Sequence, residues 1–105
     1  MIIQQFIRQY VTNKYLPKIF IDIRSKKEIE KYGMIPNARH IECEKFITKV
    51  RHNKIRIPKT QEMVIYCQRG SRSRRATFYA NHYGYNATDL EGGYFGWLKN
   101  YIKTR

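Results

Sequence analysis

Apolar positions along the chain follow two periods, one typical of helices and one typical of strands. The first sixteen residues carry a single apolar stripe at helical spacing, made of Ile3, Phe6, Ile7, Tyr10 and Val11. The run Ile19 to Ile23 is β-branched and mostly apolar, which favours a strand covered on both faces. The pattern therefore predicts an N-terminal helical extension over residues 1–16, followed by a core that starts at residue 17.

Helical and extended signals alternate through the rest of the chain. Ser25 and Glu28 have the spacing of a capping box, which predicts a short helix ended by Gly33. Further strands are expected at 38–41, 63–66 and 86–90, and further helices around 46–50, 76–83 and 94–102. Strands that alternate with helices imply right-handed crossovers and a mainly parallel sheet, so the fold class is α/β.

Composition limits the chain to a single unit. The 105 residues are 42% hydrophobic and 14% aromatic, enough for one core. The two cysteines are 24 positions apart and form no C-x-x-C pair, and the three histidines (His40, His52 and His82) lack metal-ligand spacing. No apolar stretch reaches the length of a membrane span and no signal peptide is evident, so we expect a cytoplasmic protein that contacts no membrane and needs no metal or organic cofactor.

The charge is strongly positive, with 21 Lys and Arg against 8 Asp and Glu and a formal net charge of +13. Basic residues concentrate in Lys49 to Lys59 and again in Arg69 to Arg75. Such runs are usually solvated faces. The alternative is a binding module that docks an acidic protein or a nucleic acid, although no nucleic-acid-binding motif accompanies the charge.

The segment from Cys67 to Ser73 carries the clearest chemical signal. It follows a strand of the buried type and leads into a helix, and ligands of parallel sheets bind at this end of the strands. Backbone N–H groups of a short loop that enters a helix converge on its centre, and Gly70 allows the necessary backbone angles. With Arg69 and Arg72 nearby, this setting favours the thiolate of Cys67 over its thiol.

A thiolate in that position is a candidate nucleophile. The alternative is that Cys67 is a buried cysteine with a packing role only. A second enzyme class is disfavoured by spacing. Cysteine-dependent phosphatases need an arginine six residues after the cysteine to clamp phosphate, and Ser73 stands there.

Four motifs in order resemble the rhodanese homology domain, a sulfurtransferase family. They are Ile21–Arg24 for its D-x-R segment, Gly33–Ala38 for its G-H-I-P-G-A turn, Val64–Ser73 for its catalytic loop, and Leu90–Gly93 with Trp97 for its closing L-E-G-G…W. The resemblance extends from Ile19 to about Tyr101. Met34 and Asn37 depart from it, because the family usually has His and Gly at these positions.

The resemblance implies a single domain over residues 1–105, with a three-layer fold and a central sheet of about five strands. It also implies a thiosulfate sulfurtransferase in which Cys67 takes a sulfane sulfur from a small anionic donor and passes it on as a persulfide. The acceptor would be a small thiol or a protein. The site would consist of catalytic Cys67, the substrate-binding residues Gln68, Arg69, Gly70, Ser71, Arg72 and Ser73, and the supporting residues Asp22 and Arg24.

Three residues outside the loop bear on this site. Asp22 and Arg24, at the end of the neighbouring strand, are interpreted as a structural ion pair that buttresses the loop. Cys43 follows the short strand 38–41 and could share a sheet edge with Cys67 as a resolving thiol, although a small packing residue is the simpler interpretation.

Overall fold

The computed structural model describes residues 18–104 of the chain, and side chains to residue 100. The predicted helical extension, residues 1–16, and Pro17 lie outside these residues. Four strands form one parallel sheet in the order β2-β1-β3-β4. Their bounds are β1 (Ile19–Asp22), β2 (Arg39–His40), β3 (Glu62–Tyr66) and β4 (Asn86–Asp89). The α/β class and the parallel sheet are confirmed.

The expected count of about five strands is corrected to four within the described residues. Each of the four overlaps a strand predicted from the sequence. The longest connection between the described elements, residues 52–61, contains Pro58, which has no N–H to donate to a neighbouring strand. It runs as turns between α3 and β3 and adds no strand to the sheet.

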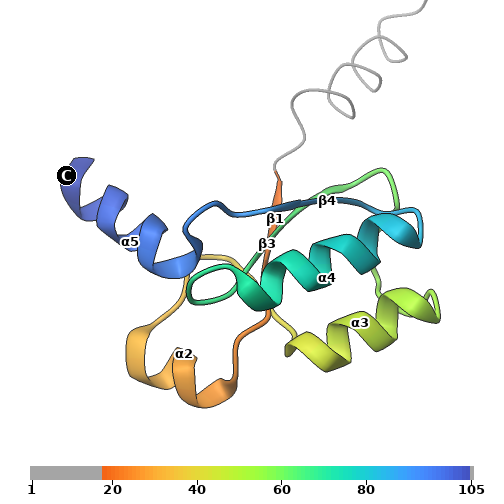
Figure 1. The fold of residues 1–105 in the computed structure, drawn as a ribbon, viewed down its shortest axis with the longest axis horizontal. Helices are drawn as coiled ribbons and strands as arrows, with labels where there is room; N and C mark the ends of the chain where they lie inside the picture. Colours follow the sequence, from red (N-terminus) through yellow and green to blue (C-terminus); the bar gives the residue numbers. More distant parts are fainter. Residues whose placement is uncertain (1–17, 105) are drawn as a thin grey trace, which may run out of the picture.

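Within residues 18–104, four helices connect and cover the strands: α2 (Lys26–Tyr32), α3 (Cys43–Arg51), α4 (Ser71–His82) and α5 (Gly93–Thr104). Figure 1 shows α3 and α4 side by side along the sheet, with α2 and α5 at the end where the strands finish. The predicted capping box is present, since Ser25 Oγ accepts from the N–H of Glu28 and the Glu28 carboxylate accepts from the N–H of Ser25. Gly33 ends α2 as expected, with φ of 81°.

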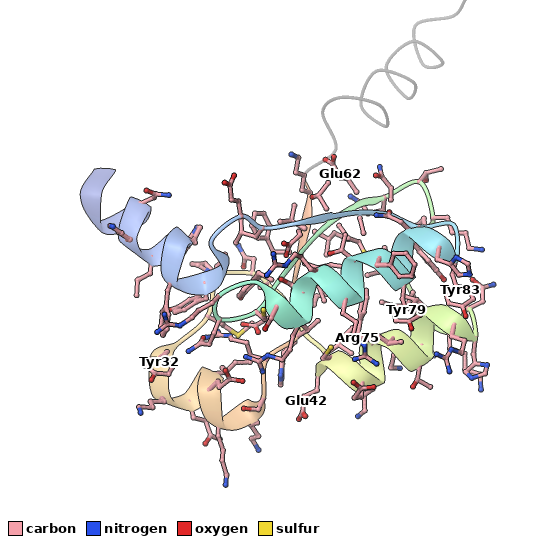
Figure 2. The ribbon with its side chains drawn as sticks, in the orientation of Figure 1. Tyr32, Glu42, Glu62, Arg75, Tyr79 and Tyr83 are labelled. Carbon is pink, nitrogen blue, oxygen red and sulfur yellow. The ribbon has the colours of Figure 1, made fainter. Side chains whose placement is uncertain are left out.

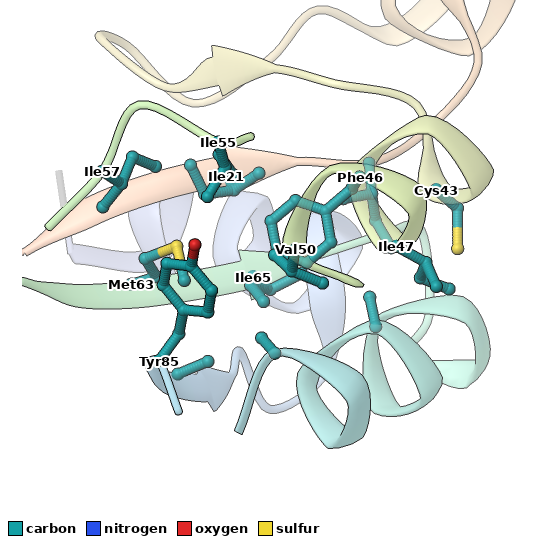
Figure 3. Close-up of a cluster of buried hydrophobic side chains, with 14 of the residues drawn as sticks. Ile21, Cys43, Phe46, Ile47, Val50, Ile55, Ile57, Met63, Ile65 and Tyr85 are labelled. Atoms are coloured by element: carbon teal, nitrogen blue, oxygen red, sulfur yellow. The ribbon is translucent and has the colours of Figure 1, made fainter. Parts of the chain in front are cut away.

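The core lies on both faces of the sheet because successive strand side chains point to opposite sides. On one face, Ile21, Met63 and Ile65 pack under α3 and α4 (Figure 3). On the other face, Tyr66 packs with Ile35 and Tyr94, with side chains of α5 beside them. The sheet is therefore the middle of three layers, as predicted.

The turn after α2 contains the two departures from the family motif, and its backbone accounts for one of them. Asn37 has φ of 68°, in the left-handed region that favours glycine but that asparagine tolerates better than most residues. Asn37 thus supplies the conformation for which the family uses glycine. The structure offers no reason for Met34.

No helix within residues 18–104 is long and apolar enough to cross a membrane.

Candidate functional site

Cys67 stands at the carboxyl end of β3, in the middle of the sheet. Residues Cys67 to Gly70 form the turn, and Ser71, Arg72 and Ser73 form the first turn of α4. The predicted loop 67–73 is therefore partly a turn and partly the start of a helix. Gly70 has φ of 121°, which a residue with a side chain rarely adopts, and no atom lies within 4 Å of the position a Cβ would take. Backbone conformation, and not crowding, requires glycine here.

The sulfur of Cys67 lies among two backbone donors and one hydroxyl. The N–H of Gly70 donates to Sγ at 3.2 Å and the N–H of Ser73 at 3.4 Å, while Ser73 Oγ lies 3.4 Å from Sγ. Cys67 itself is only 1% exposed. The convergence of N–H groups expected from the strand-to-helix turn is present, and it places partial positive charge around the sulfur.

Two opposing effects act on the pKa of the Cys67 thiol. Burial alone would raise it, because a thiolate loses solvation. Hydrogen bonds from the Ser73 hydroxyl and from the backbone of Ser73, Gly70 and Arg72 outweigh burial, so the pKa of Cys67 lies below its ordinary value. The donor cradle, more than the arginine charges expected from the sequence, favours the thiolate.

The start of α5 holds the turn from outside. The N–H of Tyr94 donates to the Cys67 carbonyl at 2.8 Å and that of Phe95 to the Gln68 carbonyl at 3.3 Å. A Cβ on Gly93 would lie 2.5 Å from the Gln68 oxygen and 2.7 Å from the Cys67 oxygen. Gly93 therefore allows the helix end to approach the turn closely, which gives the final glycine of Leu90–Gly93 a physical reason.

Asp22 and Arg24 form a fully buried ion pair, with Arg24 Nη2 2.6 Å from Asp22 Oδ2. Arg24 also donates through Nη1 to Gln68 Oε1 at 2.6 Å and through Nη2 to the Gly33 carbonyl at 2.6 Å. Its guanidinium lies 4.2 Å from the centre of the Tyr94 ring. Arg24 thus joins β1, the end of α2, α5 and the Cys67 turn.

Arg72 is engaged with α2. Its Nη1 and Nη2 each lie 2.7 Å from a carboxylate oxygen of Glu28, a bidentate pair that lowers the pKa of Glu28 from 4.5 to about 2. Arg69 is exposed and lies over the ring of Phe95 at 5.4 Å. Arg74 is exposed. Arg75 points from α4 toward α3 (Figure 2), where its guanidinium pairs with the Glu44 carboxylate. Within the described residues, Arg69 and Arg74 have no acidic partner.

Cys43 lies at the start of α3, at the same edge of the sheet as Cys67. Its thiol is 3.9 Å from the carbonyl oxygen of Arg72, and both cysteines are free. Burial, followed by the charge of Glu44, raises the pKa of Cys43. The peptide between Arg72 and Ser73 is trans, so its C=O and N–H point in opposite directions, one to Cys43 and the other to Cys67. This peptide therefore separates the two thiols.

A cleft of about 690 Å³ opens beside the turn. Ser71, Arg72 and Arg75 of α4 line one side, and Cys43, Glu44 and Lys45 line another. Cys67 does not line it. The cleft therefore lies on the Cys43 side of the Arg72–Ser73 peptide.

Three contributors to the site were not identified from the sequence as functional residues. Glu28 was assigned only to the capping box, and Gly93 only to a motif. Asp89, which accepts a hydrogen bond from Ser73 Oγ, carried no signal at all, because its contact joins the end of β4 to the first turn of α4. Only the parallel order of β3 and β4 brings these two residues together.

Known proteins resemble this chain both in sequence and in fold. Residues 5–100 match the family described as Rhodanese-like domain. A sulfurtransferase from Allochromatium vinosum is 35% identical over 83 residues, or 78% of this chain and 73% of that protein. The putative sulfurtransferase YtwF of Bacillus subtilis is 32% identical over 77 residues, or 73% of this chain and 70% of that protein.

A solved structure, a rhodanese-like domain protein from Staphylococcus aureus, is similar at a TM-score of 0.66 and 26% identity, and covers 87% of this chain and 83% of that one. The resemblance carried by the four motifs is thus confirmed by a match over most of the chain and by a shared parallel-sheet architecture. The chain belongs to the rhodanese-like domain family.

Proposed function

We propose that the protein is a sulfurtransferase that carries a sulfane sulfur on Cys67. The observation that supports this most is the surroundings of Cys67 Sγ, where two backbone N–H groups donate to the sulfur, the Ser73 hydroxyl lies beside it and the pKa of the thiol is lowered. The same donors suit a persulfide anion, which needs hydrogen bonds to a terminal sulfur in place of water. A cysteine with a packing role alone would not need them.

With thiosulfate as donor, the reaction has two balanced steps. The Cys67 thiolate attacks the outer sulfur of thiosulfate, forming a sulfur–sulfur bond while sulfite leaves with the electron pair of the broken bond. An acceptor nucleophile then attacks the outer sulfur of the Cys67 persulfide. The acceptor takes that sulfur, and Cys67 leaves again as a thiolate.

The charged side chains suggest how a donor approaches. Arg69 is exposed, is next to Gln68 and has no acidic partner within residues 18–104, so we assign it the attraction of a dianionic donor. The guanidinium of Arg72 is held by the Glu28 carboxylate, so Arg72 closes the side of the turn instead of attracting the donor. Gln68, Gly70, Ser71 and Ser73 complete the proposed substrate-binding set. A reducing compartment such as the cytoplasm would keep both thiols in the free state seen here.

A turnover assay tests the proposal. Thiosulfate and cyanide are supplied to the wild type, to Cys67→Ser and to the matched control Cys43→Ser, and thiocyanate is measured. We expect turnover by the wild type and by Cys43→Ser, and none above background by Cys67→Ser. No turnover with thiosulfate or with a small-molecule persulfide as donor would overturn the proposal and favour a binding module. That alternative requires nucleic-acid affinity that falls steeply with salt.

A further inference from the structure

The hydroxyl of Ser73 lies among three groups that compete for its proton. Ser73 is fully buried, and its Oγ lies 3.4 Å from Cys67 Sγ, 3.2 Å from the Gly70 carbonyl oxygen and within hydrogen-bond distance of Asp89 Oδ1. A hydroxyl has one proton to donate and two lone pairs with which to accept. Three potential acceptors therefore face one proton.

The carboxylate is the strongest of these acceptors while Cys67 is a thiol. A hydrogen bond to a charged oxygen is roughly twice as strong as one between neutral groups. The Gly70 carbonyl is neutral and already accepts from the N–H of Arg74 at 3.1 Å. When the Ser73 proton points to Asp89, only lone pairs face Cys67, so Ser73 can accept from the thiol but cannot stabilise the thiolate.

We propose that Asp89 is a positioning residue that restrains the ionisation of Cys67 by holding the proton of the Ser73 hydroxyl. The thiolate gains the Ser73 hydrogen bond only when that hydroxyl turns from Asp89 to Sγ. This deepens the proposed function and rests on it for its purpose, since it sets how much nucleophile is present before a donor arrives. The residue acts through Ser73 and contacts no reacting atom.

Other charged or titratable groups also lie around the Cys67 turn. Arg72 stays cationic and paired with Glu28, and the pKa of Cys43 is raised. The ion pair of Asp22 and Arg24 contacts the turn through Gln68. The charged or titratable groups that face the turn from the surrounding elements are Asp22 and Arg24 (β1), Glu28 (α2), Cys43 (α3), Arg72 (α4), Asp89 (β4) and Tyr94 (α5).

The test is the pH dependence of iodoacetamide alkylation at Cys67, read on its own peptide by mass spectrometry so that Cys43 serves as an internal control. The variants are Asp89→Asn, Asp89→Ala, Ser73→Ala and the double variant Ser73→Ala with Asp89→Asn. We expect the alkylation midpoint of Cys67 to fall by roughly one pH unit in both Asp89 variants, because the Ser73 proton becomes available to the thiolate. In the Ser73→Ala background, the Asp89→Asn change should move the midpoint by less than half as much.

An unchanged or raised midpoint in the Asp89 variants would overturn the proposal. An equal downward shift with and without the Ser73 hydroxyl would also overturn it, because the effect would then be the charge of Asp89 acting directly. If Asp89→Asn does not fold, judged by circular dichroism, Asp89→Ala provides the same comparison. Alkylation requires no sulfur transfer, so a thiol that responds to Asp89 but never takes up sulfur would contradict only the proposed function.

Discussion

The two cysteines show how one sheet edge can prepare two thiols in opposite ways. Cys67 and Cys43 are both buried, at 1% and 9% exposure, and both contact the first turn of α4. Cys67 faces the N–H of Ser73, whereas Cys43 faces the C=O of Arg72, from the same peptide. The pKa of Cys67 is lowered and that of Cys43 is raised.

Hydrogen-bond donors, and not burial, make the pKa values of these two thiols shift in opposite directions. Burial on its own would raise the pKa of both thiols. Only Cys67 has N–H groups aimed at its sulfur, because it stands before a helix whose first N–H groups have no partner within the helix. Cys43 is itself the first residue of a helix, and its N–H donates to the Ile23 carbonyl at 3.0 Å. Removing the supports of Cys67 one at a time should therefore bring the two thiols closer in behaviour.

The largest loss is expected from Arg24→Met. It leaves the Asp22 carboxylate buried without its partner, and breaking such a pair costs about 3–5 kcal/mol of unfolding free energy. Gln68 also loses its hydrogen bond to Arg24, which loosens the Cys67 turn. In the fraction of the variant that folds, Cys67 should therefore be alkylated no faster than Cys43. Urea denaturation measures the first effect. Arg75→Met, which breaks the exposed pair with Glu44, is the control and should change stability much less.

Gly93→Ala should have an intermediate effect. The new Cβ would lie 2.5 Å from the Gln68 oxygen and φ is 63°, so overlap and left-handed strain together should cost about 2–4 kcal/mol. The turn must shift, which should slow alkylation of Cys67 while Cys43 keeps its rate. Gly96→Ala is the matched control, because its Cβ meets only the Glu91 oxygen at 3.4 Å. Equal behaviour of the two variants would show that α5 does not shape the turn.

Glu28→Gln should have the smallest effect, because glutamine can keep the capping box but not the ion pair with Arg72. We expect a loss of about 1 kcal/mol at neutral pH. The pKa of Glu28 is lowered from 4.5 to about 2, so this contribution is complete above pH 4.5 and is lost as the pH falls toward 2. Denaturation of both proteins across this range should show their difference shrink. A difference independent of pH would rule out the ion pair as its cause.

Local signals predicted most of the fold. The capping box of Ser25 and Glu28, the β-branched run of β1 and the glycine after α2 each act within a few residues, so α2 and the strands were predicted near their observed bounds. The strand count, taken from the family, was one too high for the described residues. The fold therefore follows mainly from short-range patterns.

The centre of the candidate site and one of its supports, the pair of Asp22 and Arg24, could be predicted from the sequence, but the other supports could not. Cys67 and its turn follow from one strand-to-helix junction. The partner of Arg72 depends on where α2 lies, and the contact of Asp89 with Ser73 depends on the pairing of β4 with β3. No local pattern encodes these tertiary contacts. They decide that Arg72 is paired and that the Ser73 proton is contested.

Locating the transferred sulfur tests directly whether Cys67 carries it. The wild type is incubated with thiosulfate, freed of donor, alkylated and digested, and the peptides of Cys67 and Cys43 are weighed. We predict one added sulfur atom on the Cys67 peptide and none on the Cys43 peptide, with the addition kept in Cys43→Ser and lost in Cys67→Ser. Sulfur found on Cys43, or on neither peptide with any sulfane donor, would contradict the account.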